Sequence, residues 1–220
     1  MAEPSSFCRQ PPASAGPEQP KGRQSAGDAA YWDNQAATFD DDPDHGLRDP
    51  RVADAWRRLL RTHLPSSPAA VADIGCGTGT LSVLLAAEGY AVTGLDFAPA
   101  MVREARAKAR AAGVTARFVL SDATAPTLPP GSFDVVLARH VLWAMPDADE
   151  ALAAWLRLLL PGGTLVLIEG RWSTGAGLTT AEAGRAVLRH RTDATITALD
   201  DPVLWGGPVS DERYLLVSRR

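Results

Sequence analysis

The sequence predicts an α/β fold with a doubly wound, mostly parallel sheet, and three observations support this prediction. Short apolar runs alternate with helical segments from Val71 onward, a pattern typical of parallel strands joined by crossover helices. The glycine-rich turn GCGTG at 75–79 directly follows the first of these runs. Two apolar runs near the C-terminus, 193–201 and 212–220, are joined by too little chain for a crossover helix. We therefore expect this last pair of strands to be antiparallel.

The individual elements follow from periodicity and from the residues that end them. The expected strands are 69–74, 90–96, 116–122, 132–141, 163–170, 193–201 and 212–220. Helical spacing predicts helices over 79–89, 98–113, 146–163 and 179–191. The first two helices end at Gly89 and Gly113, and the third at the pair Gly162-Gly163, because glycine readily terminates a helix.

The segment before the first strand divides into two parts. Residues 1–27 are rich in Pro, Ser, Gly, Ala and Gln, a composition that predicts a disordered tail. Residues 28–65 contain a helix that starts at Pro50 and is capped by Asp49, and they carry a heavy load of aromatic side chains. We expect 28–65 to form a helical lid over the strand ends, with a helix packed statically on the sheet as the alternative. Residues 66–220 then form the main domain.

Length, charge and cysteine content narrow the class of protein. A chain of 220 residues suits one α/β domain. Its net charge of −4 provides no field that attracts nucleic acid or anionic lipid. No apolar run is long enough to cross a bilayer. Cys8 and Cys76 have neither disulfide nor metal-ligand spacing, so we expect a cytoplasmic protein without a bound metal.

The acid that precedes the glycine-rich turn restricts the kinds of ligand that the turn can bind. The dinucleotide fingerprint requires its third glycine one place later than Gly79, and no lysine of a phosphate-binding loop is present. Asp73 ends the first strand, where a carboxylate would repel a pyrophosphate and attract an ammonium or sulfonium group. An amino acid, or S-adenosylmethionine with its sulfonium, meets these requirements. A tight turn without a ligand is the alternative.

Acids also end the next two strands. Asp96 can accept hydrogen bonds from both hydroxyls of a ribose, and Asp122 can accept from an adenine amino group beside the Ala123 amide. Phe97 and Met101 would supply apolar surfaces for the adenine. A single acid at a strand end is commonly a capping residue. Acids at the ends of three consecutive strands, on one edge of the sheet, favour a binding site.

With these features, the sequence resembles the class I S-adenosylmethionine-dependent methyltransferases. Within this family it is similar to the small-molecule subgroup of the ubiquinone and menaquinone biosynthesis type. The similar segments, within about 71–170, are VADIGCGTGTLS, GLDFAPAMVREAR, SDATAPTLPPGSFDVVLARHVLWAMPD and LLLPGGTLVLIEG. The resemblance implies a Rossmann-like, seven-stranded sheet with an antiparallel last strand. It implies cofactor contacts at Asp73, Gly75, Gly77, Gly79, Asp96, Asp122 and Ala123, and Cys76 is a small residue within the same loop.

Methyl transfer from a sulfonium is an in-line displacement, so orientation of the reactants supplies much of the rate. A base is needed only where the acceptor carries a proton of high pKa. His140 follows the fourth strand beside the glycine loop and is the best-placed candidate base; a residue that only shapes the pocket is the alternative. Its neighbour Arg139 faces either the cofactor or a surface acid.

Candidate substrate contacts come from three places in the chain. Trp143 follows His140 and either covers a planar substrate or belongs to the core. Arg171 and Trp172 follow the fifth strand in a glycine-rich loop, where Arg171 is explained equally well by solvation. Tyr31 and His45 reach the site if the N-terminal segment folds over it.

The sequence therefore predicts a cytoplasmic methyltransferase that acts on a small molecule, as a monomer or homodimer. Methylation of a protein, and a non-catalytic cofactor-binding module, are the alternatives. Whether oxygen, nitrogen, sulfur or carbon accepts the methyl group stays open.

Overall fold

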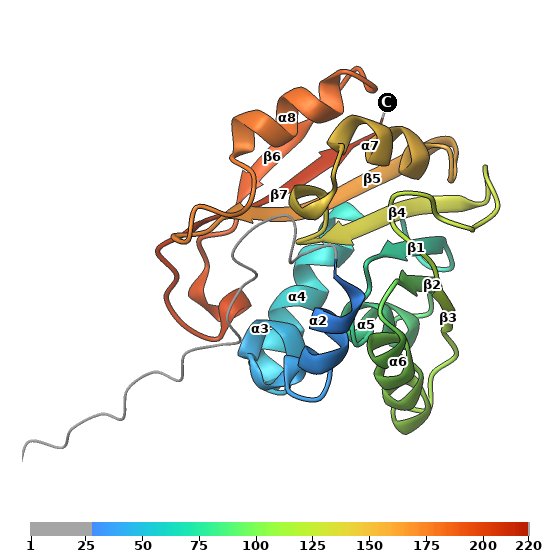
Figure 1. Cartoon of the computed structure of the whole chain (residues 1–220), viewed down its shortest axis with the longest axis vertical. Coiled ribbons are helices and arrows are strands. Elements are labelled where there is room, and N and C mark those ends of the chain that lie inside the picture. The colour runs from blue at the N-terminus through green and yellow to red at the C-terminus, as the bar shows by residue number, and fades with distance from the viewer. Residues whose placement is uncertain (1–27, 220) are drawn as a thin grey trace, which may run out of the picture.

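The computed structural model describes residues 28–219, and the prediction of a disordered tail over 1–27 lies outside this part of the chain. Within it, a single mixed sheet runs through the molecule and helices cover both of its faces (Figure 1). Among the described residues, no helix is long and apolar enough to cross a membrane.

The sheet has seven strands in the order β3-β2-β1-β4-β5-β7-β6. The strands are β1 (Ala70–Ile74), β2 (Ala91–Asp96), β3 (Arg117–Leu120), β4 (Phe133–Arg139), β5 (Leu159–Arg171), β6 (Thr195–Ala198) and β7 (Glu212–Ser218). Strands β1 to β5 pair in parallel, whereas β7 is antiparallel to both β5 and β6. The predicted doubly wound sheet with an antiparallel last strand is confirmed. The chain order reverses between β1 and β4, and folds of this kind bind ligands at such a switch point.

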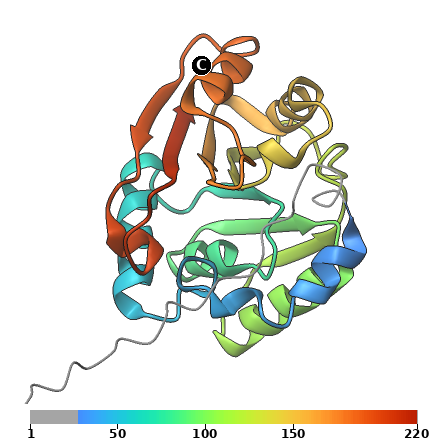
Figure 2. The same ribbon diagram turned by 60° about the vertical axis from the view of Figure 1, so that its left-hand side comes forward.

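Helices cover the sheet in two groups, visible in Figures 1 and 2. The helices are α2 (Ala29–Gln35), α3 (Pro43–Gly46), α4 (Pro50–His63), α5 (Thr80–Ala87), α6 (Pro99–Ala111), α7 (Ala148–Leu156) and α8 (Thr180–Leu188). Three short 3-10 turns are η1 (Phe39–Asp41), η2 (Leu142–Ala144) and η3 (Pro202–Trp205). Because side chains alternate along a strand, Val136 packs in the core under α7 and α8, and Val135 in the core under α4 and α5.

The expected N-terminal segment contains two different kinds of structure. Helix α4 begins with Pro50 after the Asp49 cap, as predicted, and buries Trp56 and Leu60 in a core shared with β1, β4 and β5. It therefore packs on a face of the sheet. Helices α2 and α3 instead lie at the carboxyl edge of the parallel strands, where their side chains line a cavity.

One expected helix is wrong in its extent. Helix α7 ends at Leu156, not at Gly162-Gly163, and these glycines lie inside strand β5. The leucines that continue the helical pattern at the end of the predicted helix lie instead at the start of β5, where Leu159 pairs with Phe133 of β4. Pairing with a neighbouring strand overrides the local helical preference here, because it buries Leu159 against the core.

Candidate active site

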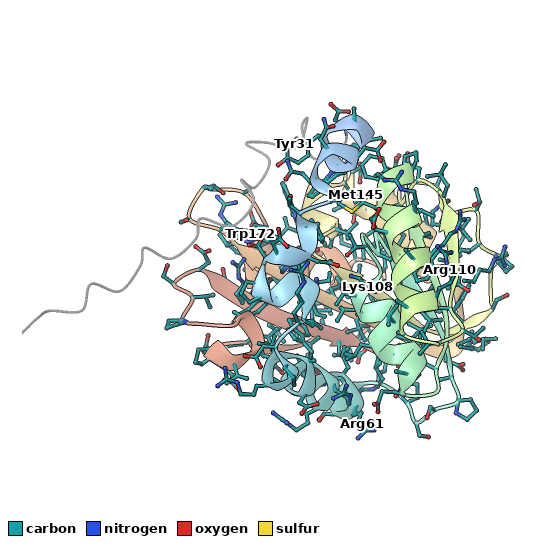
Figure 3. All side chains as sticks on the ribbon, turned by 90° about the horizontal axis from the view of Figure 1, so that it is seen from below. Tyr31, Arg61, Lys108, Arg110, Met145 and Trp172 are labelled. Carbon is teal, nitrogen blue, oxygen red and sulfur yellow. The ribbon has the colours of Figure 1, made fainter. Side chains whose placement is uncertain are left out.

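A cavity of about 230 Å³ lies at the carboxyl ends of β1, β2 and β4, and α2 and α3 form one of its walls. Most of the residues predicted from the sequence line it: Tyr31, His45, Asp73, Gly75, Cys76, Gly77, Asp96, Phe97, Met101, Asp122, Ala123, Arg139, His140 and Trp143. Gly79, Arg171 and Trp172 do not line it. Figure 3 views this side of the molecule and labels Tyr31, Met145 and Trp172.

The glycine turn needs its glycines for two physical reasons. Gly75, Gly77 and Gly79 all have positive φ angles, of 61°, 54° and 76°, which side chains rarely adopt. A Cβ on Gly79 would lie 2.7 Å from the Ala105 Cβ, so this glycine serves close packing of the turn on α6. A Cβ on Gly77 would meet only the Phe39 ring, at 3.4 Å, so the backbone there faces the cavity.

Asp73 presents a buried carboxyl group to the cavity. Its Oδ2 accepts a hydrogen bond of 2.6 Å from the Ser82 hydroxyl. Burial raises the pKa of Asp73 to about 6, while the Ser82 hydrogen bond and the charge of Arg139 act in the opposite direction. A cationic group bound here would favour the ionised carboxylate.

Asp96 connects the second strand to the glycine turn. Its Oδ2 accepts from the Gly77 N–H and its Oδ1 from the Ala98 N–H, each at 2.9 Å. Burial raises the pKa of Asp96 to about 6, and these backbone hydrogen bonds partly offset that effect. Each carboxylate oxygen has a second lone pair for a ligand hydroxyl.

The third acid is placed differently. Asp122 is exposed at the cavity rim, where its Oδ1 accepts from the Thr124 N–H at 2.8 Å. The neighbouring Ala123 is buried, and its carbonyl accepts from the Trp155 indole N–H at 2.7 Å, which holds this loop against α7.

These residues fit S-adenosylmethionine. Asp73 and Asp96 are acids suited to a cation and to hydroxyl groups, and the apolar side chains of Phe97 and Met101 line the same cavity. Residues 72–167 match the family model described as "Methyltransferase domain". This part of the chain, somewhat less than half of its 220 residues, is therefore similar to a methyltransferase domain.

Relatives of the methyltransferase domain agree with this assignment. A demethylmenaquinone methyltransferase from Thermus thermophilus is 40% identical over 117 residues, which cover 52% of this chain and 53% of that protein. A ubiquinone biosynthesis O-methyltransferase from Xanthomonas euvesicatoria pv. vesicatoria is 36% identical over 138 residues, which cover 62% and 54%. The chain therefore aligns with about half the length of these curated relatives.

The similarity in fold to solved structures covers more of this chain than the sequence similarity to the curated relatives. The structure of geranyl diphosphate C-methyltransferase from Streptomyces coelicolor A3(2) superimposes with a TM-score of 0.66 over 93% of this chain and 100% of that one. The two sequences are 17% identical over this match, so it shows the common Rossmann-like fold alone.

His140 sits in the methyltransferase domain in an unusual backbone conformation, with a φ of 60°. Its N–H donates to the Ile168 carbonyl at 2.8 Å, and its own carbonyl accepts from the Trp143 indole at 2.9 Å. Burial lowers the pKa of His140 well below 6.5, and the charges of Arg139 and Arg213 lower it further. The ring is therefore uncharged at neutral pH.

Arg139 extends from the same strand end into the cavity wall. Its Nη1 donates to the Asp44 carbonyl at 2.7 Å, and its guanidinium lies over the Trp56 ring, 5.4 Å from the centroid. Burial lowers the pKa of Arg139, and the charges of Asp44 and Asp73 act against this effect. Arg139 thus connects the methyltransferase domain to the α3 segment.

Glu169, which is completely buried at the end of β5, positions the loop that follows His140. Its Oε1 accepts from the N–H groups of Val141 and Leu142 at 3.0 and 2.7 Å. Burial raises the pKa of Glu169 to about 8 despite these hydrogen bonds. The sequence signal for this role was an acid that ends the fifth strand, on the same edge as the other acids.

The α2–α3 segment is attached to the domain by two aspartates that sequence reasoning did not single out for this role. The Ala100 N–H at the start of α6 donates to Asp33 at 2.6 Å. Asp40 forms a 2.7 Å ion pair with Lys108 of α6 and accepts a 2.6 Å hydrogen bond from the Thr78 hydroxyl. Among the described residues, no group of three or more His, Cys, Asp or Glu side chains is arranged to hold a metal.

His45 lies buried in the same segment, stacked on Phe39 with ring centroids 4.3 Å apart. Its Nδ1 is 3.4 Å from Asp42, and its Nε2 is 3.7 Å from Asp44. Burial lowers the pKa of His45 to about 4, which outweighs the opposite effect of Asp44. His45 is therefore an uncharged part of the cavity wall at neutral pH.

Of the residues outside the cavity, Arg171 is exposed and donates to the Gly177 carbonyl at 3.1 Å. Trp172 is buried behind the cavity wall, with its ring 5.1 Å from that of His140. Their assignment to the substrate stays a prediction.

Proposed function

We propose that this chain is an S-adenosylmethionine-dependent methyltransferase that methylates a small-molecule metabolite. The observation that carries the proposal is the convergence of Asp73 and Asp96 on one cavity beside a glycine turn with positive φ angles. The relatives named for demethylmenaquinone and ubiquinone biosynthesis support a small, ring-containing substrate class.

In this proposal the parts of the cavity have separate tasks. Asp73 holds the cationic end of the cofactor, with Gly75, Cys76 and Gly77 lining the approach, and Asp96 accepts from the ribose hydroxyls. Phe97, Met101, Asp122 and Ala123 surround the adenine. S-adenosylmethionine, when bound, supplies an electrophilic methyl group on its sulfonium. Arg139 faces the amino-acid end of the cofactor.

The remaining wall is available to the substrate. Tyr31, His45 and Trp143 line the cavity from the α2–α3 segment and from η2. Because α2 and α3 line one side of the cavity and lie outside the sheet, we propose that they act as a lid that excludes water from the reaction. His140 is the candidate base, uncharged and thus able to accept a proton, although its low pKa makes it a weak one.

A small-molecule substrate suits the enclosed cavity better than a protein or nucleic acid, and the net charge of −4 disfavours nucleic acid. A cytoplasmic location, and a monomeric or homodimeric state, remain predictions from the sequence.

The test has two stages. Purified protein should bind S-adenosylhomocysteine in calorimetry without added metal, and should not bind NAD. Incubation with S-adenosylmethionine labelled in its methyl group and a bacterial metabolite extract should then transfer label to a small molecule. Binding without any transfer to small molecules would favour the non-catalytic module, and label on protein would favour a protein methyltransferase.

A further inference from the structure

His140 lies at a strained point of the backbone, between β4 and the short turn η2. Its φ angle of 60° is in the left-handed region, which residues with a Cβ rarely adopt. A residue in this conformation persists only where its surroundings hold it, and such residues are often found at active sites. The hydrogen bonds of His140 to Ile168 and Trp143 fix its own N–H and carbonyl. The position of the next residues depends on a different contact.

That contact is made by Glu169, which takes the place of a capping residue for η2. Val141, at the usual capping position, forms no side-chain hydrogen bond with the turn. Instead, Oε1 of Glu169 on the neighbouring strand β5 accepts from the N–H groups of Val141 and Leu142, at 3.0 and 2.7 Å. The side chain is fully buried, and its Oε2 has no partner among the described residues. A buried acid with an unpaired oxygen is costly, which points to a role in holding this loop rather than in stabilising the core.

The loop of residues 140–142 that Glu169 holds also packs on the glycine turn. A Cβ on Gly75 would lie 2.6 Å from Cγ2 of Val141, so the valine side chain fits closely against this glycine. Gly75, His140 and Val141 all line the cavity. A displacement of loop 140–142 would therefore move the candidate base and disturb its contact with the cofactor-binding turn at the same time.

Glu169 can hold the loop without a charge. Burial raises the pKa of Glu169 to about 8, so the group that accepts at neutral pH is a neutral carboxyl oxygen. Tyr214 lies opposite Glu169 in the register of β5 and β7, but its hydroxyl donates to the carbonyls of Leu178 and Thr179. A glutamine oxygen can accept the same two N–H groups, whereas a methionine of similar size cannot.

The place of the His140 ring determines its protonation. The charged groups that face the ring are Arg139 of β4 and Arg213 of β7, while His45 of α3 is uncharged at neutral pH. Burial and these two cations hold the pKa of His140 well below 6.5. A ring released from the cavity wall into water would return to the ordinary histidine pKa of about 6.5.

We propose that Glu169 is a positioning residue for His140, and that its two hydrogen bonds to loop 140–142 keep the His140 ring in the cavity wall beside the glycine turn. Kept there, the ring is uncharged and can accept a proton. Glu169 acts through the loop, since it does not line the cavity itself. The inference rests on the proposed function for the role of His140 as a candidate base.

The experiment follows the His140 ring by NMR in the whole chain labelled with nitrogen-15 histidine. Loss of one signal in His140→Gln identifies the ring. In the parent, this signal should stay that of an uncharged ring from pH 8 to pH 6. Glu169→Met removes the acceptor and should free the loop, so that the ring is about three-quarters charged at pH 6. Glu169→Gln keeps the acceptor oxygen and should behave as the parent.

Val217→Ala is the matched control, because Val217 is buried in the core on the opposite face of the sheet from the Glu169 side chain. This variant loses core contacts, but its His140 signal should stay as in the parent. An unchanged signal in folded Glu169→Met, or a titrating ring in Glu169→Gln, would overturn the inference.

If Glu169→Met does not fold, hydrogen exchange in the parent decides the question. Slow exchange of the Val141 and Leu142 amides supports the positioning role, and fast exchange overturns it. Failure of the parent to bind S-adenosylhomocysteine would instead overturn the proposed function, since the histidine signal reports the position of the ring without any turnover.

Discussion

Glu169 on β5 accepts a 2.7 Å hydrogen bond from the backbone N–H of Leu142, which lies in η2, after the neighbouring strand β4. The same oxygen accepts from Val141, so one buried carboxyl group secures the start of η2 and the position of the cavity wall after His140. Because burial raises the pKa of Glu169 to about 8, this carboxyl group is protonated at neutral pH in the folded state.

The first prediction concerns the pH dependence of stability. The folded protein keeps the Glu169 proton up to about pH 8, whereas the unfolded chain loses it near pH 4.5. The contribution of Glu169 to stability is thus complete below pH 4.5 and is lost as the pH rises toward 8, by about 1.4 kcal/mol per pH unit at most. Glu169→Gln should lack this slope, as urea unfolding at pH 5.5 and 7.5 will measure. If the free energy of unfolding changes equally with pH in the parent and in Glu169→Gln, the prediction is wrong.

The second prediction concerns cofactor affinity. Asp96→Ala removes the acceptor for the ribose hydroxyls and should weaken S-adenosylhomocysteine binding at least about tenfold. Because burial raises the pKa of Asp96 to about 6, affinity of the parent should also fall as the pH drops below 6. In calorimetry, Asp96→Asn should show a smaller fall than the parent, because Asp73, whose pKa is also about 6, still titrates in this variant, and exposed Asp200→Asn should behave as the parent. If Asp96→Ala binds S-adenosylhomocysteine as tightly as the parent, Asp96 does not contact the cofactor.

The third prediction concerns His140. If this residue removes a proton from the acceptor, His140→Ala should slow methyl transfer by roughly 10²–10⁴-fold with unchanged S-adenosylhomocysteine affinity. Because burial and nearby cations hold its pKa well below 6.5, the rate of the parent should stay level between pH 8 and 6. A rate for His140→Ala within threefold of the parent, which corresponds to about 0.7 kcal/mol, would assign His140 to shaping the pocket.

The fourth prediction concerns the proposal that α2 and α3 act as a lid. Lys108→Met removes the ion pair with Asp40 and should weaken S-adenosylhomocysteine binding by about three- to tenfold. Arg110→Met changes an exposed arginine on the same helix, labelled beside Lys108 in Figure 3, and is the control. Backbone amides of residues 31–48 should exchange hydrogen faster in the free protein than in the complex. Equal exchange in both states would identify a static helical cover.

Much of the cofactor half was predictable because parallel strands present their carboxyl ends on one edge. Asp73 lies one residue before the end of β1 and Asp96 ends β2, so strand recognition alone places them together. The glycine turn was predictable for a different reason, since positive φ angles at alternate residues strongly favour glycine at those positions. Capping by Asp49 and the position of Pro50 likewise located the first residue of α4.

The surroundings of His140 depended on contacts between segments far apart in the chain. Trp205 and Arg213 come from the connection after β6 and from β7, and only the antiparallel placement of β7 beside β5 brings them to His140. The extent of β5 was mispredicted because Leu159 follows a helical pattern locally and is held in the sheet by pairing with Phe133.

By itself, the sequence determined the order of strands and helices, the acidic edge and the ligand class that this edge accepts, because these depend on local periodicity and residue chemistry. The tertiary structure decided which contacts hold the surroundings of the cavity in place: the Asp40–Lys108 ion pair, the Glu169 hydrogen bonds and the packing of Arg213 over the Trp172 ring. Each of these contacts joins distant segments, and their geometry follows from packing of the whole core, which no local pattern encodes.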